Sequence, residues 1–256
     1  IYLDHGATTP VDPQVAESMR EMLLTDFGNP SSAHQFGADV RKKLAWARLV
    51  IAGSINASPE EIIFNSGGSE SDNWALRGVA QAYAKKGKHL ITTQIEHPAI
   101  LDTCRQMEKQ GFEVTYLPVD NLGLIDLAAL KNAIRPDTVL VSIMAANNEI
   151  GTILPLAEIG RICHEQGTLF HTDAVQAFTK VKIDVEAMQI DLLTLTAHKI
   201  HGPKGVGCLY IKKGVRIDKM IYGGHQEHDK RAGTENTPGI IGFAKAAELA
   251  NEQHVS

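Results

Sequence analysis

The chain alternates between short apolar runs and stretches whose apolar residues recur with the period of a helix. The short runs are typical of buried strands and predict strands at residues 62–64, 90–93, 114–117, 139–144, 168–171, 192–196 and 206–211. The periodic stretches predict helices at residues 73–86, 99–110, 127–134 and 156–166. This alternation predicts an α/β fold, in which a mostly parallel sheet carries helices on both faces.

The segment before this alternation is predicted to hold an arm and two helices. Residues 1–12 form a short extended N-terminal arm, and Asp12 then caps a helix that has Pro13 in its first position. A second helix follows, around Leu44. Residues 13–256 are expected to form one large domain, because a chain of 256 residues, 43% of them hydrophobic, can bury about three quarters of its unfolded surface in a single core.

Composition and charge narrow the possible partners. The formal net charge is -5 and no basic stripe stands out, so no nucleic-acid partner is expected. No apolar run approaches the roughly 20 residues that cross a bilayer, so no membrane partner is expected either. The cysteines, Cys104, Cys163 and Cys208, lie far apart, a spacing that predicts neither a disulfide framework nor a metal site. A reducing, cytoplasmic location is the simplest expectation.

A lysine at the end of a predicted strand is the first candidate for chemistry. Lys199 follows the apolar strand at residues 192–196 and precedes a short turn at residues 202–205, which holds it at the edge of the sheet. Partial burial there disfavours the ammonium form and lowers the pKa of the amine. A free amine attacks an aldehyde to form a Schiff base, so we interpret Lys199 as the carrier of pyridoxal phosphate. A solvated lysine in a loop is the alternative.

Residues that follow other strands matter most, because ligands of open parallel sheets bind beyond the carboxyl ends of the strands. A glycine-rich turn at residues 65–70 opens a helix, where backbone amides and the helix dipole favour a phosphate group. His97 follows the strand at residues 90–93 and is suited to stacking on a planar ring or to moving a proton. A turn without a ligand and a loop histidine are the corresponding alternatives.

The next two strand ends add a carboxamide and a carboxylate. Asn148 lies in the turn after residues 139–144 and can donate to a phenolic oxygen of the cofactor. Asp173 follows residues 168–171, with Gln176 close behind, and a buried carboxylate there needs a cationic partner such as a protonated pyridine nitrogen. Turn chemistry explains the asparagine equally well, and a helix cap or a structural ion pair explains Asp173. All these groups are predicted to lie along one edge of the sheet.

Ordered motifs along the whole chain extend this interpretation. They lie at residues 2–4, 7–10, 27–31, 66–73, 96–97, 147–151, 173–176, 198–199, 202–205 and 233–236. They resemble the motifs of the cysteine desulfurases, pyridoxal-phosphate enzymes of the class V aminotransferase family that supply sulfur for iron–sulfur cluster assembly. The resemblance implies the large domain of a type I pyridoxal-phosphate-dependent transferase, with the C-terminal small domain largely absent.

The resemblance also implies a role for each candidate site residue. Lys199 is implied to be the Schiff-base lysine, and His97 to be a second catalytic residue that stacks on the ring and carries protons. Asp173 is implied to bind the pyridine nitrogen. The other implied cofactor contacts are Gly68, Ser69, Thr196 and His198 to the phosphate, Asn148 and Gln176 near the ring oxygen, and Thr234 to the phosphate of a second subunit, so that a homodimer follows.

The implied reaction removes sulfur from L-cysteine. The substrate displaces Lys199 from the cofactor aldehyde, and a cysteine thiolate of the enzyme attacks the substrate sulfur, leaving L-alanine and a persulfide for a sulfur-acceptor protein. In the family this cysteine, and an arginine that grips the substrate carboxylate, lie beyond the position of Ser256, where the chain stops in what looks like an unfinished helix. The chain alone is therefore expected to bind the cofactor without completing sulfur transfer. Its three cysteines fall in predicted helices or strands and are expected to pack in the core.

Some positions depart from the family pattern. The pair at residues 5–6 replaces a small polar pair, Ser69 replaces a threonine, and Thr196 replaces a serine. His225 and Asp229 replace glycines, and their side chains cost stability if those backbones have positive φ.

Two other functions stay open at this point. One is a different class V reaction, such as that of a selenocysteine lyase or a transaminase. The other is a non-catalytic scaffold that keeps the fold and binds sulfur-acceptor proteins.

Overall fold

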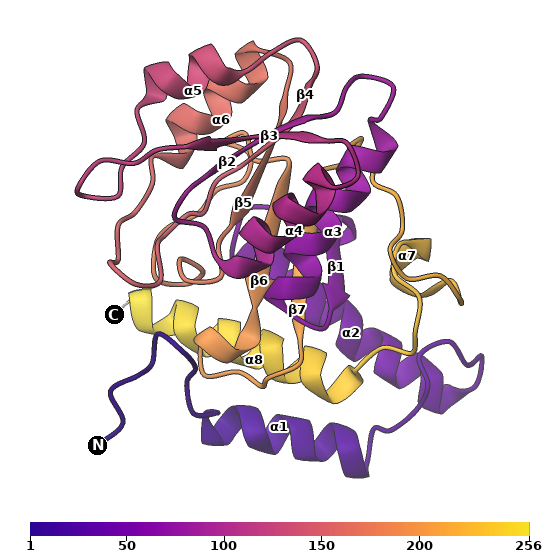
Figure 1. Cartoon of the computed structure of the whole chain (residues 1–256). Coiled ribbons are helices and arrows are strands. Elements are labelled where there is room, and N and C mark those ends of the chain that lie inside the picture. Colours follow the sequence, from indigo (N-terminus) through magenta and orange to yellow (C-terminus); the bar gives the residue numbers. More distant parts are fainter. Residues whose placement is uncertain (256) are drawn as a thin grey trace.

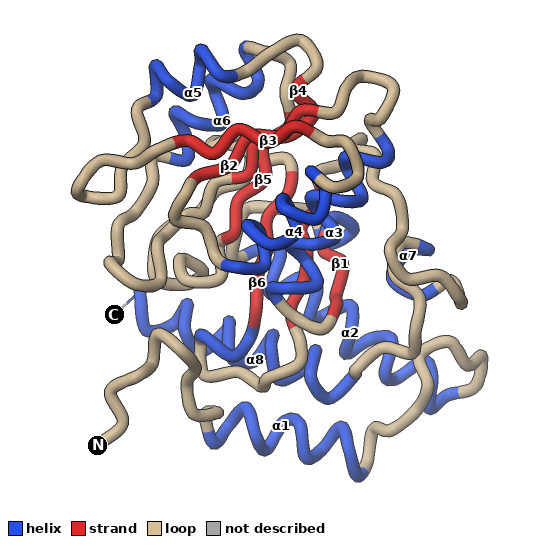
Figure 2. The backbone as a smooth tube through the Cα atoms, in the orientation of Figure 1, coloured by secondary structure: helices blue, strands red, loops and turns tan. Residues whose placement is uncertain are grey.

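The computed structural model describes residues 1–255, which are built around one seven-stranded sheet (Figures 1 and 2). The strand order is β1-β7-β6-β5-β4-β2-β3. The strands are β1 (Ile62–Asn65), β2 (His89–Thr93), β3 (Glu113–Leu117), β4 (Thr138–Ser142), β5 (Leu169–Asp173), β6 (Leu192–Thr196) and β7 (Gly207–Ile211). Strand β7 runs antiparallel to its neighbours β1 and β6, and the remaining pairs are parallel. The predicted mostly parallel sheet is confirmed.

Helices cover both faces of the sheet, as Figure 1 shows. They are α1 (Pro13–Leu24), α2 (Gln35–Gly53), α3 (Gly68–Ala82), α4 (Pro98–Glu108), α5 (Leu127–Ala133), α6 (Leu156–Glu165), α7 (Gln226–Asp229) and α8 (Thr237–Val255), with short 3₁₀ turns η1 (Pro59–Glu61) and η2 (Ala197–Lys199). Ile62 and Phe64 of β1 pack in a cluster with residues of α1, α2, α6 and α8, whereas Ile63 packs with α3 and α4. Strands buried on both faces explain the continuous apolar runs in the sequence.

The observed bounds of α1 and α3 can be compared with the bounds predicted from the sequence. The prediction for α1 is confirmed, because Asp12 accepts a hydrogen bond from the Gln14 amide at 2.7 Å and Pro13 starts the helix. The prediction for α3 was wrong at both ends, since the helix spans Gly68–Ala82 instead of residues 73–86. Its glycines and serines are weak helix formers, but the first turn is fixed by packing against the sheet, where Ser71 is fully buried.

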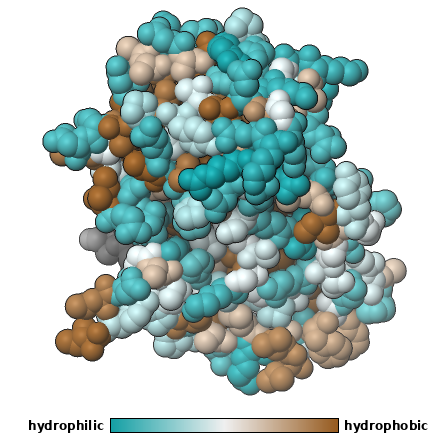
Figure 3. Space-filling view, in the orientation of Figure 1, coloured by the Kyte–Doolittle hydropathy of each residue, from teal (hydrophilic) through white to brown (hydrophobic). Residues whose placement is uncertain are grey.

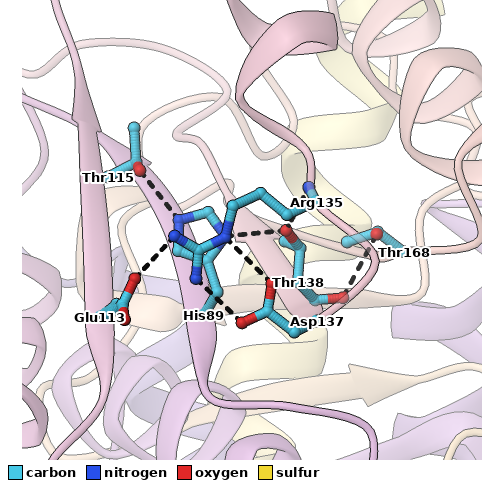
Figure 4. A network of polar contacts seen from close by, with 7 residues as sticks. All are labelled: His89, Glu113, Thr115, Arg135, Asp137, Thr138 and Thr168. Atoms are coloured by element: carbon cyan, nitrogen blue, oxygen red, sulfur yellow. Dashed lines mark hydrogen bonds and ion pairs between the residues drawn. The ribbon is translucent and has the colours of Figure 1, made fainter.

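The edge of the sheet where β2, β3 and β4 begin is tied by a polar network (Figure 4). The two ring nitrogens of His89 lie 2.7 Å from Thr138 Oγ1 and 2.8 Å from Thr115 Oγ1. Arg135, in the loop before β4, donates to Glu113 of β3 at 2.6 Å, so the network spans the intervening strand β2. Burial lowers the pKa of His89, so its ring is neutral near pH 7. This network stabilises the sheet at the edge opposite the carboxyl ends of these strands.

The N-terminal arm leaves apolar side chains on the surface. Ile1, Tyr2 and Leu3 are exposed, and Figure 3 shows hydrophobic colour at the lower left, where Figure 1 places the N-terminus. Farther along, the arm is tied to the turn behind β6, because Thr9 Oγ1 donates to the His198 carbonyl at 2.9 Å. Within residues 1–255 there is no helix whose length and apolar character would let it cross a membrane.

Thr179 has a backbone conformation that suggests a stability test. Its φ is 59°, in the left-handed region that a β-branched residue rarely adopts. We expect Thr179→Gly to raise the free energy of unfolding by about 1 kcal/mol, because the relieved strain of roughly 1–3 kcal/mol exceeds the entropic cost of glycine. Urea unfolding measures the change. Thr25, at φ −112°, is the control: Thr25→Gly is expected to destabilise, and an equal loss at Thr179 would contradict the idea of strain.

Candidate active site

The carboxyl ends of the central strands open onto a cavity of about 460 Å³, a size typical of small-molecule sites. It lies between the strand ends, the N-terminus of α3 and the N-terminal arm. Nearly all the predicted site residues line it: Gly68, Ser69, His97, Asn148, Asp173, Gln176, Thr196, His198 and Lys199. Thr234 does not, and it lines a separate cleft with Asn65 and Glu227.

Lys199 ends the turn η2 that follows β6, as its position in the sequence predicted. Its Nζ donates to the carbonyl oxygens of Gly6 and Ala7, the latter at 2.8 Å. Burial lowers the pKa of the Lys199 amine, while the nearby carboxylates of Asp173 and Asp4 raise it. The arm therefore holds the amine in the cavity wall, with a larger fraction in the nucleophilic, uncharged form.

Asp173 is the last residue of β5 and is 7% exposed. Its carboxylate accepts a hydrogen bond from the Val175 amide at 2.9 Å. Burial raises the pKa of Asp173, and the Val175 amide and the charge of Lys199 act against this rise. A cationic group of a ligand in the cavity would offset the cost of burying this carboxylate.

The N-terminus of α3 forms one end of the cavity. Gly67 caps the helix at φ 136°, a conformation open to glycine. A side chain on Gly207 of β7 would come within 2.7 Å of the Gly67 Cα, so the turn lies directly against the strand. The amides of Gly68 and Ser69 belong to the first turn, where N–H groups have no acceptor within the helix. Together with the helix dipole they favour an anion.

Thr196 and His198 lie beside this helix terminus and line the same cleft. The Thr196 hydroxyl donates to the Val206 carbonyl at 3.2 Å, and His198 Nδ1 lies 3.1 Å from Thr8 Oγ1. Burial, followed by the charges of nearby lysines, lowers the pKa of His198. Both side chains are thus held in place by polar contacts with the backbone or the arm.

Three further predicted residues line the cavity on turns after strands or at the start of a helix. His97 caps α4, since its Nδ1 accepts from the Ala99 amide at 3.1 Å, which leaves Nε2 as the other ring nitrogen. Asn148 lines the cavity, whereas its neighbour Asn147 is buried and bonds the turn. Gln176 Nε2 donates to the Gly6 carbonyl at 2.9 Å, and its carboxamide is therefore oriented by the arm.

Asp72 and the arm carbonyls were missed by reasoning from sequence. Asp72 lines the cavity from α3 although it is 1% exposed. Its spacing offered a signal, because Asp72, Leu76 and Val79 share the buried face of the helix. An acidic residue on an apolar face is unusual. The arm carbonyls had no such signal, since backbone groups are the same at every residue.

The cysteines are buried, as predicted. Burial raises the pKa of Cys104 and Cys163 to about 12, and raises that of Cys208 as well. None of the three is suited to act as a thiolate nucleophile. Within the described part of the chain, no group of three or more His, Cys, Asp or Glu residues is arranged to hold a metal ion.

The backbone of residues 225–229 shows whether His225 and Asp229, which replace glycines of the family pattern, have positive φ. Asp229 has φ 61°, in the left-handed region, whereas His225 has φ −98° and needs no glycine. The Asp229 carboxylate lies 2.7 Å from Lys219 Nζ and 2.8 Å from His225 Nδ1. A strain cost is therefore expected at Asp229 and not at His225.

Comparison with known proteins shows the family to which this chain belongs. Residues 1–256 match the family described as Aminotransferase class-V. A cysteine desulfurase IscS of Clostridium botulinum is 55% identical over 252 residues, which cover 98% of this chain and 64% of the relative. Among solved structures, a NifS-like protein aligns with a TM-score of 0.96 at 45% identity, covering 99% of this chain and 70% of that one. A structure described as SspA in complex with cysteine has a TM-score of 0.94 at 43% identity and covers 96% and 72% of the two chains. This chain thus spans a little under two thirds of that curated relative.

Proposed function

Because the chain belongs to the class V aminotransferase family, whose members depend on pyridoxal 5′-phosphate, we propose that it is the cofactor-binding large domain of a cysteine desulfurase. The observation that carries this proposal is the Lys199 amine, held in the wall of a small-molecule cavity near a buried carboxylate at Asp173. The chemistry of the other lining residues is consistent with the same cofactor.

The donors and acceptors of the cavity fit the parts of pyridoxal phosphate. Gly68 and Ser69 would bind the phosphate through their amides, with Thr196 and His198 beside them. Asp173 would hold the pyridine nitrogen, and Lys199 would bind the aldehyde carbon. His97 would lie against the ring, and Asn148 and Gln176 would lie near the ring oxygen.

The side chains of the cavity would have distinct tasks in catalysis. When bound, pyridoxal phosphate draws electrons from the amino-acid substrate through its ring. Asp173, as an anion, would keep the ring nitrogen protonated. Lys199 Nζ would hold or move a proton once the substrate amine has taken its place, which a lowered pKa favours. His97, bonded through Nδ1 to the Ala99 amide, would hold or move a proton at Nε2.

The proposed substrate is L-cysteine, and the products are L-alanine and an enzyme persulfide. A thiolate attacks the substrate sulfur and breaks its bond to carbon, and the sulfur then passes to an acceptor protein for iron–sulfur cluster assembly or another sulfur-transfer pathway. The buried Cys104, Cys163 and Cys208 are not offered as this nucleophile. We also propose a cytoplasmic homodimer in which Thr234 reaches the phosphate of the second subunit from its own cleft.

The product formed from each amino acid tests this proposal. We expect the full-length protein, given L-cysteine and excess dithiothreitol, to release L-alanine and sulfide in equal amounts, since the thiol reduces the persulfide. The same assay with L-selenocysteine, and with amino-acid and keto-acid pairs, measures the rival class V reactions. A higher rate with selenocysteine, or amino transfer to a keto acid, would replace the proposed activity. No turnover together with a stable complex with a sulfur-acceptor protein would favour a scaffold.

A further inference from the structure

Asp72 is a buried carboxyl group in the wall of the cavity. It lies on α3, is 1% exposed, and lines the same cavity as Asp173. Among the described residues its Oδ1 has no hydrogen-bond partner. A buried carboxylate without a cation or enough donors is costly, and such a group lowers that cost by keeping its proton.

The groups that face Asp72 supply no counter-charge. On β5 these are Asp173 and His171, on β6 Thr194, and in the turn after β2 Glu96. His171 Nε2 lies 3.9 Å from Asp72 Oδ1, beyond hydrogen-bond distance, and is bonded to Thr194 Oγ1 at 3.0 Å. Glu96 is 4% exposed, and burial raises its pKa to about 8, so it too favours the neutral form at pH 7.

His171 is fully buried with hydroxyl groups at both ring nitrogens, which favours a neutral ring. His171 Nε2 lies 3.0 Å from Thr194 Oγ1, and a hydroxyl can pair with a neutral ring nitrogen as donor or as acceptor. The other ring nitrogen, Nδ1, lies 2.8 Å from the Ser142 hydroxyl oxygen. Burial lowers the pKa of His171 to about 3, so the ring is neutral at pH 7. His171 therefore does not offset a charge on Asp72.

The two aspartates differ in how well they can bear a charge. Asp173 accepts from the Val175 amide, and the charge of Lys199 favours its ionised form. Asp72 is disfavoured as an anion first by burial and next by the charge of Asp173, and is helped only by the Thr194 hydroxyl. Asp72 and Asp173 line the same cavity, and the charge of Asp173 raises the pKa of Asp72, so the two carboxyl groups titrate as a pair and the proton belongs on the poorer anion.

We propose that Asp72 is a positioning residue for Asp173: a second carboxyl group of the cavity wall that stays protonated, so that the pair has one negative charge and Asp173 carries it. The consequence for the cofactor rests on the proposed function, because a single anion is what one protonated pyridine nitrogen needs. The protonation of Asp72 does not rest on it.

Unfolding of the cofactor-free protein at several pH values tests the protonation. An acid whose pKa is higher in the folded than in the unfolded state favours folding fully below its unfolded pKa of about 4, and this contribution is lost as the pH rises toward the folded value. Relative to Asp72→Asn, which has the shape of the neutral acid, the folding equilibrium constant of the wild type should fall by up to about tenfold per pH unit in that window. Asp102→Asn is the matched control at an exposed carboxylate, and its unfolding should follow the pH dependence of the wild type.

An equal pH dependence in the wild type and Asp72→Asn would overturn the proposal. If Asp72→Asn does not fold, infrared spectra of Glu96→Gln, which lacks the other neutral carboxyl group near Asp72, decide instead. A neutral carboxyl band at pH 5 to 7 is expected from Asp72, and a spectrum without one would overturn the proposal.

Binding of pyridoxal phosphate tests the positioning role separately. We expect Asp173→Asn to weaken binding by tenfold or more and to change the pH profile of the cofactor absorbance, because it removes the single anion. Asp72→Asn should keep the wild-type pH profile, because it leaves that charge in place. A profile shifted as much by Asp72→Asn as by Asp173→Asn would put the charge on Asp72 and overturn the proposal. If the wild type binds no pyridoxal phosphate, the proposed function fails, and the unfolding data still decide whether Asp72 is protonated.

Discussion

Replacing Lys199 by alanine is expected to abolish covalent attachment of pyridoxal phosphate. Lys199 is the single lysine among the described residues that line the cavity, and its carbonyl partners Gly6 and Ala7 hold the amine there. Burial lowers its pKa and so increases the free amine that attacks the aldehyde. After one equivalent of cofactor and borohydride reduction, intact mass should show one attached cofactor on the wild type and none on Lys199→Ala. The yellow colour of the complex should be lost as well.

Lys180 provides the matched control for this experiment. Burial lowers the pKa of its amine too, and its Nζ lies 3.4 Å from Gln176 Oε1, but it does not line the cavity. Lys180→Ala should therefore retain one covalently attached cofactor. Full labelling of Lys199→Ala, or loss of labelling in Lys180→Ala, would show that burial of an amine near the site is insufficient to identify the reactive one.

The order of strands and helices could be predicted because each central strand is buried on both faces and reads as an apolar run. The position of Lys199 followed from the same pattern, since β6 ends three residues before it. The pairing of β7 with β1 could not be predicted in this way, because the partners lie far apart in the sequence. The start of α3 at Gly68 could not be predicted either, because tertiary packing and not local helix propensity fixes its first turn.

The residues that line the cavity also differ in whether the sequence alone could identify them. Side chains at strand ends, such as Asp173, could be identified because parallel strands bring their carboxyl ends to one edge. The contribution of the arm could not, because Gly6 and Ala7 act through carbonyl oxygens that no residue type reveals. Asp72 lay within a recognised motif, but its burial beside Asp173 depends on how α3 packs on the sheet.

Glu227 explains how the loop before Thr234 tolerates an unfavourable backbone. Glu227, His228 and Asp229 all have positive φ, at 49°, 56° and 61°. The Glu227 side chain is buried, and its carboxylate accepts from Arg48 Nη2 at 2.5 Å and from the Phe64 amide at 2.7 Å. These bonds fasten the loop to α2 and β1 and offset the strain of roughly 1–3 kcal/mol that each left-handed residue costs. Nothing in the sequence separates this glutamate from its exposed neighbours.

Removing the arginine of this pair is expected to lower the free energy of unfolding by about 3–5 kcal/mol, because it leaves a buried carboxylate without its cation. The side chains of Arg48 and Glu227 are 13% and 3% exposed, and Arg48 also donates to the Ile62 carbonyl at 2.5 Å. Arg48→Met keeps much of the aliphatic length, so urea unfolding of this variant measures mainly the loss of the charge and its hydrogen bonds.

A second substitution distinguishes the cost of the unpaired Glu227 charge from the cost of the packing lost with Arg48. Adding Glu227→Gln to Arg48→Met should recover part of the stability, because the neutral amide can still accept from the Phe64 amide without a buried charge. The control is the exposed pair of Arg20 and Glu17, where Arg20→Met should cost less than about 1 kcal/mol. If Arg48→Met costs no more than Arg20→Met, the ion pair is not what holds the strained loop, and the left-handed residues must be stabilised by contacts other than this carboxylate.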